Sequence, residues 1–160
     1  MGLADLSSIL WREREMLELL LFKLEEEQLV LAAGRTRWLA HATREVEMVL
    51  DQIRQTEVLR AAEVEAVAAE LGLGSNPSLS QLADAVGSPW SDLLRDHRKT
   101  FLALTAEISA LAEANRDLLS TGQRAVREAM LAVTGSFETY SRHGETVAAA
   151  PRARLIDEAM

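Results

Sequence analysis

The chain has 160 residues and a formal net charge of −8, from 25 acidic and 17 basic residues. This acidic balance argues against non-specific binding of nucleic acid, because such binding requires Lys and Arg to neutralise phosphates. There is no cysteine, which excludes disulfides, cysteine-based zinc sites and thiol catalysis. Aromatic residues make up only 4% of a chain rich in Leu, Ala and Glu. The composition therefore predicts an all-α protein that is long enough to bury a core.

The first residues of the chain, 1–5, lack the basic and apolar regions of a secretory signal, so no signal peptide is expected. The longest purely apolar run near them, 19–22, is far too short to span a bilayer. We therefore expect a soluble, cytoplasmic protein without membrane insertion.

The first long helix is expected to end at Gly34, where a helix stop is typical. Leucines at every seventh position line one of its faces, as in helices that pack along their length. They are Leu3, Leu10, Leu17, Leu24 and Leu31. A companion row contains Leu6 and Leu20, and its other positions hold glutamates, at 13 and 27. Glu13 and Glu27 either reach solvent at the edge of the seam, or one of them meets a cationic partner.

The second long helix is expected to run from Thr36, a candidate N-cap, to Leu71. Its apolar stripe shifts by one row in the second half, and Arg60 stands at this crossover. An antiparallel hairpin that turns about Gly34 brings Arg60 close to the first half of the first helix. We therefore predict that Arg60 approaches Glu13.

A connector follows the second helix. Residues 72–77 are rich in Gly, Ser, Asn and Pro and are expected to form a loop. Ser78 and Gln81 match a capping box, which predicts a short helix that ends at Gly87. The connector imitates a helix-turn-helix, but residues 75–94 contain no Lys or Arg with which to contact DNA. We interpret it as a structural connector, and a DNA-binding regulator is a distant third reading of the chain.

The third long helix is expected to run from Pro89 to Val133, with Ser88 as its N-cap. Apolar residues recur along it in the pattern of a helix packed on another helix. Asn115 occupies one of these apolar positions. It either fixes the register of the seam or offers its amide to a bound polypeptide, and we favour the register role. His97 lies on the same stripe and is interpreted as a packing residue rather than a ligand.

Together these elements predict three long, mainly antiparallel helices with a short connector helix before the third. Residues 1–134 are expected to form the helical bundle domain, and residues 135–160 a mobile C-terminal segment. No histidine follows a glutamate by three positions, which disfavours the di-iron site of some bundles. No phosphate-binding loop or nucleophile elbow occurs either. We expect no metal, no cofactor and no enzymatic activity.

Several short stretches occur in a recognisable order along the chain. They are Glu27-Gln28-Leu29-Val30-Leu31, Leu59-Arg60 before Leu71-Gly72, the connector over 79–90, Leu111-Ala112-Glu113-Ala114-Asn115 with Leu118-Leu119, and Tyr140-Ser141-Arg142-His143-Gly144. From Leu6 to Gly144, this order resembles that of the FlgN-type flagellar export chaperones.

The resemblance implies a cytoplasmic helical chaperone that binds the C-terminal regions of hook-associated proteins, which form the hook–filament junction. Such a chaperone keeps these clients from assembling prematurely and delivers them to the type III export gate. The resemblance also implies that the C-terminal segment binds the client and that a C-terminal tyrosine docks to the gate. Tyr140 is the residue that matches this tyrosine.

The third helix offers a surface that fits this function. A chaperone that covers apolar faces of client helices needs an exposed apolar helix face of its own, and Met suits a surface that must release its ligand. Our candidates for client binding are Leu119, Val126, Met130, Val133 and Phe137. The alternative is that they are ordinary bundle core. In the leading rival function, the chain is a structural coiled-coil protein that self-associates through the same seams. The sequence does not decide between a monomer and a homodimer.

Overall fold

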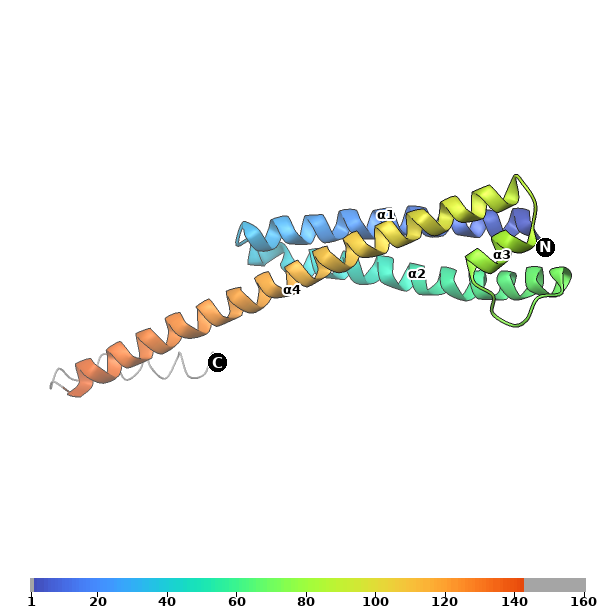
Figure 1. Cartoon of the computed structure of the whole chain (residues 1–160). Helices are drawn as coiled ribbons and strands as arrows, with labels where there is room; N and C mark the ends of the chain where they lie inside the picture. The colour runs from blue at the N-terminus through green and yellow to red at the C-terminus, as the bar shows by residue number, and fades with distance from the viewer. Residues whose placement is uncertain (1, 143–160) are drawn as a thin grey trace. The chain divides into compact units, whose positions relative to one another are not determined.

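Four helices make up the computed structural model, which describes the backbone of residues 2–142 and the side chains of residues 2–135. They are α1 (Leu3–Ala32), α2 (Thr36–Leu71), α3 (Leu79–Ala85) and α4 (Trp90–Arg142) (Figure 1). There is no strand among the described residues. The prediction of an all-α fold with a short helix before the last long one is confirmed.

The chain divides into two compact units, Met1–Asn115 and Arg116–Met160. The first unit contains α1, α2, α3 and the first part of α4, and the second unit begins with the rest of α4. Helix α4 continues past Val133, where the apolar pattern in the sequence weakens. The expected mobility of residues 135–160 mainly concerns residues outside the described part, so it stays a prediction.

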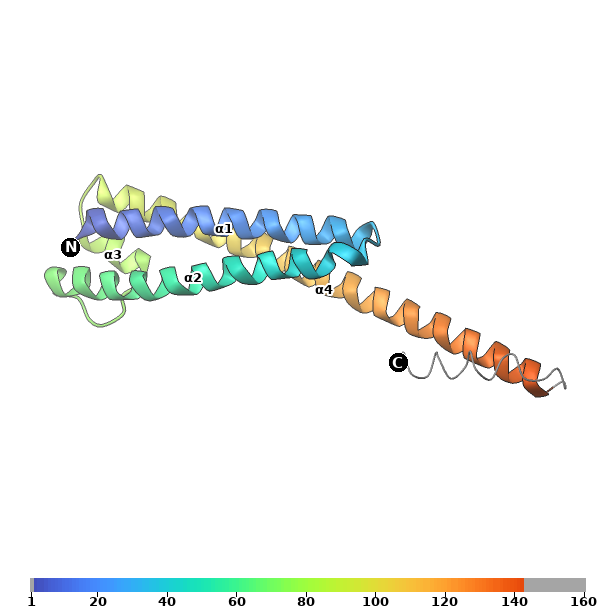
Figure 2. The ribbon, with the colours of Figure 1, turned by 180° about the vertical axis from the view of Figure 1, so that it is seen from behind.

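The core of the first unit lies where α1 and α2 run side by side and the first part of α4 packs behind them (Figure 2). One cluster of buried residues joins all four helices: Leu6, Leu10, Val64, Val67, Leu82, Ala83 and Leu94. A second cluster lies further along α1 and α2: Leu17, Leu20, Leu24, Val46, Val49 and Ile53. The leucine seam of α1 and the stripe of α2 therefore face each other, because their helical spacing keeps each set on one side of its helix.

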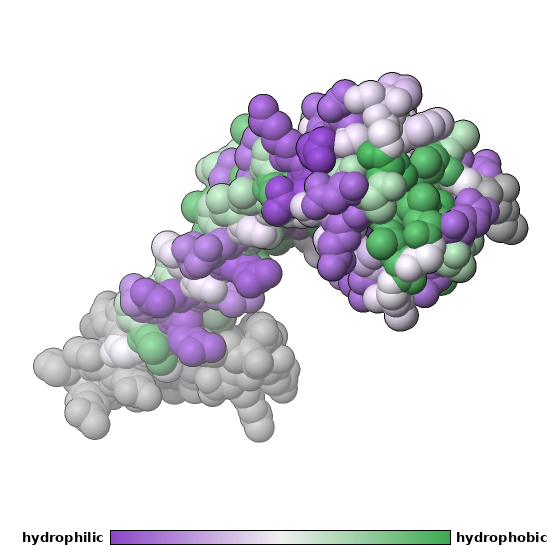
Figure 3. Space-filling view, turned by 45° about the vertical axis from the view of Figure 1, so that its right-hand side comes forward, coloured by the Kyte–Doolittle hydropathy of each residue, from purple (hydrophilic) through white to green (hydrophobic). Residues whose placement is uncertain are grey.

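Short helix α3 lies at the end of the first unit. Its Leu82 is completely buried in the first cluster. Figure 3, which looks towards this end, shows apolar residues gathered on the surface. Partly buried Leu3, Leu73, Leu79 and Val86 pack against the cluster. The connector thus covers the end of the core, as a structural role requires.

The helix ends follow from local chemistry. Gly34 and Gly72 have φ angles of 66° and 70°, a left-handed conformation that glycine adopts without strain. The capping box is confirmed, since the Ser78 hydroxyl accepts from the Gln81 N–H at 3.1 Å and the Gln81 side chain accepts from the Ser78 N–H at 2.8 Å.

Two predicted caps are wrong. Thr36 is the first residue of α2, while Arg35 occupies the N-cap position and no side chain caps this helix. Helix α4 begins at Trp90, and the Ser88 hydroxyl contacts the Asp92 carboxylate at 3.0 Å. In the second case the helix begins one residue later than expected, so Ser88 lies before the N-cap position and its hydroxyl donates to a side chain of the first turn.

Candidate functional site

A buried ion pair links α1 to α2 in the first unit. Arg60 donates Nη1 to both oxygens of the Glu13 carboxylate, at 3.1 and 3.0 Å. Glu13 is only 3% exposed. Burial raises the pKa of Glu13, and the Arg60 guanidinium opposes that rise. The predicted approach of Arg60 to Glu13 is therefore present, and the hairpin register inferred from the sequence agrees with it.

A second polar group surrounds His97 on α4. The imidazole is completely buried, with the edge of Trp11 at 4.8 Å and the ring of Phe101 stacked at 6.0 Å between centroids. Arg14 Nη1 lies 3.5 Å from His97 Nδ1 and pairs with Asp96 at 3.1 Å. Burial and the nearby Arg14 charge lower the pKa of His97, while Asp96 raises it. Burial in this packed site thus disfavours the protonated imidazole.

The surroundings of His97 favour packing over metal binding. His97 contacts the aromatic rings of Trp11 and Phe101 and the Arg14 guanidinium, which is itself paired with Asp96. Nowhere in the described part of the chain do three or more His, Cys, Asp or Glu side chains gather in an arrangement able to hold a metal ion. The packing role assigned to His97 agrees with its surroundings. The contributions of Trp11 and Arg14 were missed, because neither belongs to the apolar seam of α1.

Asn115 ends the first unit and lies 3% exposed against α1. Its Nδ2 donates to the Leu24 carbonyl at 2.9 Å and to Glu27 Oε1 at 3.1 Å. Glu27 also accepts from the Thr43 hydroxyl of α2 at 3.2 Å. Of the two readings for Glu13 and Glu27, the second holds, because Glu13 meets the cation Arg60. Glu27 instead accepts from neutral donors on two helices. These contacts support the register role of Asn115, which stays a prediction.

The second unit presents apolar side chains to solvent. Leu119, Val126 and Val133 recur at every seventh position, about two helical turns apart, and are 41%, 61% and 44% exposed. Met130 lies on the same side and is half-buried. The side chains of two further candidates, Phe137 and Tyr140, lie outside the described residues.

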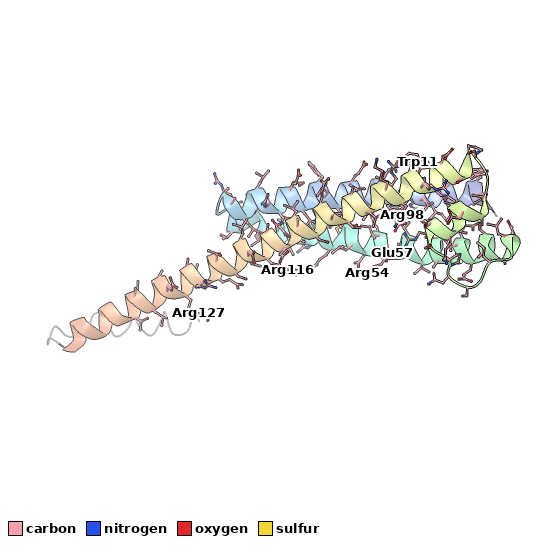
Figure 4. All side chains as sticks on the ribbon, in the orientation of Figure 1. Trp11, Arg54, Glu57, Arg98, Arg116 and Arg127 are labelled. Carbon is pink, nitrogen blue, oxygen red and sulfur yellow. The ribbon has the colours of Figure 1, made fainter. Side chains whose placement is uncertain are left out.

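We call Leu119, Val126, Met130 and Val133 the α4 stripe. Leu131 was not among the predicted client-binding residues. It is 61% exposed, but it lies on nearly the opposite side of the helix from Val126 and is not part of the stripe. Figure 4 labels Arg127, one of the charged neighbours of the stripe. An exposed row of large apolar residues is a candidate surface for binding another polypeptide.

Comparison with known proteins assigns the chain to a family. Residues 1–148 match FlgN, described as FlgN protein. The chain belongs to the FlgN family. No curated protein and no solved structure matches the chain.

FlgN proteins are chaperones of flagellar export, so this protein is a flagellar export chaperone in that general sense. The FlgN family is not known for enzymatic activity. None of the helices in the described residues is long and apolar enough to cross a membrane. For a chaperone of this kind, the exposed apolar surface of a helix is the natural candidate for client binding.

Proposed function

We propose that this FlgN protein binds the C-terminal segments of hook-associated proteins through the α4 stripe and delivers them to the type III export gate. The observation that carries the proposal is the exposure of Leu119, Val126 and Val133 on one side of α4. Half-buried Met130 adds a flexible thioether to the same side, and Met adapts to partners of imperfect shape. Phe137 extends the same spacing along the sequence.

The client of such a surface is an amphipathic helix. Apolar residues spaced by seven and by four along one helix fit the apolar face of a second helix, because both follow the same helical period. Covering that face keeps the client segment from associating with another client molecule.

A matched pair of substitutions separates the α4 stripe from the rest of the helix. Val126 and Leu131 are both 61% exposed, so Val126→Asp and Leu131→Asp place the same charge at equally exposed sites on different sides of α4. Affinity for a purified hook-associated protein is measured by calorimetry, with helicity followed by circular dichroism. We expect Val126→Asp to weaken binding about tenfold or more, as loss of an interface anchor does, and Leu131→Asp to leave it unchanged.

Equal affinities for both variants would place the client site elsewhere. Sedimentation of the same proteins addresses the rival function. If the wild-type chain is a dimer that Val126→Asp converts to monomer while client binding is absent, the α4 stripe serves self-association.

Delivery to the export gate is assigned to Tyr140 through its match to the family's C-terminal tyrosine. Tyr140→Ala is expected to retain client affinity and to lose secretion of the client from flagellated cells. Tyr140→Phe distinguishes the hydroxyl from the ring. Loss of client affinity in Tyr140→Ala would instead make this residue part of the client surface.

A further inference from the structure

Helix α1 carries a second apolar surface, on the side opposite its buried leucine seam. Trp11, Phe22 and Leu29 follow one another at intervals of about three and two helical turns, so they lie on one side of the helix. Their exposed fractions are 45%, 54% and 69%. Leu19, beside them, is 40% exposed. Isolated exposed apolar residues are common, but a row of them along a single helix face indicates a contact surface.

The spaces between these apolar residues are filled by carboxylates. The glutamates on the same side of α1 are Glu15, Glu18, Glu25 and Glu26. We call these four glutamates, with Trp11, Leu19, Phe22 and Leu29, the outer α1 face. Three cations, Arg12, Arg14 and Lys23, border this face at its edges. Within the described residues, Glu15, Glu18 and Glu25 form no ion pair. The nearby Lys23 pairs with Glu26 and with Glu45 of α2.

Two of the neighbouring cations, Arg14 and Lys23, are already engaged at the edges of this face. Arg14 stacks its guanidinium over Trp11 at 4.4 Å and pairs with Asp96. Lys23 lies 5.6 Å from the Phe22 ring centre. Figure 4 shows Trp11 on the α1 side of α4, away from Arg54 and Glu57 on α2. The contact with buried His97 holds the indole in place, which reduces the entropy lost when a partner binds it.

The net negative charge of the chain belongs to the unit that contains this face. Residues 116–160 contain equal numbers of acidic and basic residues, so the entire formal charge of −8 belongs to residues 1–115. A second copy of the chain is a poor occupant, because an outer α1 face placed against itself brings two rows of glutamates together. A partner that is both apolar and basic satisfies both features of the surface.

We propose that the outer α1 face docks an amphipathic α-helix of a partner protein, with apolar residues at helical spacing flanked by Lys and Arg. Its apolar residues pack on Trp11, Phe22 and Leu29, and its cations pair with the glutamates beside them, as charged flanks do in coiled coils. This site is separate from the α4 stripe. An export chaperone with two such surfaces holds its client on one and contacts a second protein with the other.

The experiment uses the full chain and two synthetic helical peptides of about three heptads, with leucine at the core positions. One peptide carries Lys and Arg at the flanking positions, and the other carries Glu there. Binding is measured by calorimetry at low and high salt. We expect the basic peptide to bind with an affinity that falls as salt rises, and the acidic peptide not to bind.

Paired variants locate the site. Phe22→Ser with Leu29→Ser is expected to weaken binding of the basic peptide about tenfold or more. The matched control, Met48→Ser with Val58→Ser on α2, alters residues of similar exposure, 58% and 70%, and is expected to leave binding unchanged. Glu18→Gln with Glu25→Gln is expected to flatten the salt dependence. Circular dichroism confirms that each variant is folded.

Four outcomes overturn the proposal: no binding of the basic peptide, equal binding of the acidic one, an equal loss in the α2 control, or a wild-type dimer that becomes monomeric on Phe22→Ser with Leu29→Ser. The last outcome assigns the face to a second copy. Affinity for a hook-associated protein is measured on the same variants and is expected to persist. Val126→Asp, on the α4 stripe, is expected to leave affinity for the basic peptide unchanged, so failure of either proposal is recognised independently.

Discussion

Arg60 on α2 donates a single nitrogen, Nη1, to both oxygens of the Glu13 carboxylate on α1. The Glu13 side chain is 4% exposed and that of Arg60 is 35% exposed. The cation thus reaches the carboxylate from the edge of the seam while keeping contact with water. Removing the arginine leaves a buried carboxylate without its partner, whereas most surface ion pairs can be lost at little cost.

Replacing Arg60 by Met should therefore lower the free energy of unfolding by about 1–3 kcal/mol, the cost of depriving a buried charged acceptor of its donor. Arg54→Met is the control, since Arg54 pairs with Asp51 at an exposed position and its loss should cost about 0–1 kcal/mol. Urea unfolding followed by circular dichroism gives both values. The double variant Glu13→Leu with Arg60→Met should recover much of the loss, and a double variant less stable than Arg60→Met contradicts this account.

The buried His97 predicts a pH dependence of stability. Its pKa in the folded chain lies below the ordinary value of 6.5, so the unfolded chain binds the proton more tightly. Stability from this residue is complete above pH 6.5 and is lost as pH falls towards the lowered pKa. Unfolding of wild type and of His97→Leu is compared between pH 7.5 and 5, in the range where histidine titrates.

We expect the difference in stability between wild type and His97→Leu to shrink as the pH falls. His41→Leu, at an exposed position of α2, serves as the control for the loss of a histidine. A constant difference between wild type and His97→Leu across this range means that His97 does not resist protonation in the fold.

The side-chain amide of Asn115 makes hydrogen bonds through its nitrogen but not through its oxygen. Its Nδ2 bonds the Leu24 carbonyl and Glu27, while Oδ1 is buried without a partner among the described residues. Asn115→Leu removes the unsatisfied acceptor and should raise stability by about 1 kcal/mol, or change the oligomeric state by loosening register. Asn115→Asp places a charge beside the Glu27 carboxylate and should destabilise the fold. Thermal unfolding and sedimentation read out both variants, and an unchanged Asn115→Leu on both counts contradicts the register role.

Truncation after Thr134 removes Phe137 and Tyr140 but keeps the α4 stripe. If Phe137 belongs to the client surface, affinity for a hook-associated protein should fall about tenfold, as for an interface anchor. Stability of the first unit should not change, because its core ends at Asn115. A single substitution, Phe137→Ala, is compared with the truncation. Unchanged affinity in both proteins would limit the client surface to residues before 135.

The sequence determined the helices of this protein because their signals are local. The seven-residue recurrence from Leu3 to Leu31, the capping box at Ser78 and the glycines at 34 and 72 each act through residues within a few turns. The Glu13–Arg60 pair could also be predicted, because a tight turn between two regular helices fixes which residues meet. Membership of the FlgN family likewise follows from the order of such local patterns.

Only the tertiary structure decided how the polar residues on different helices combine. His97 lies in an apolar row, but its contact with Trp11 and Arg14 depends on the rotation of α4 against α1, which no local pattern sets. Glu27 likewise gains its donors, Asn115 and Thr43, from two other helices. The outer α1 face was hidden in the sequence because the leucine seam dominates the pattern of that helix. Packing buried the seam and left Trp11, Phe22 and Leu29 exposed, since a helix in a bundle can bury only the sides that its neighbours cover.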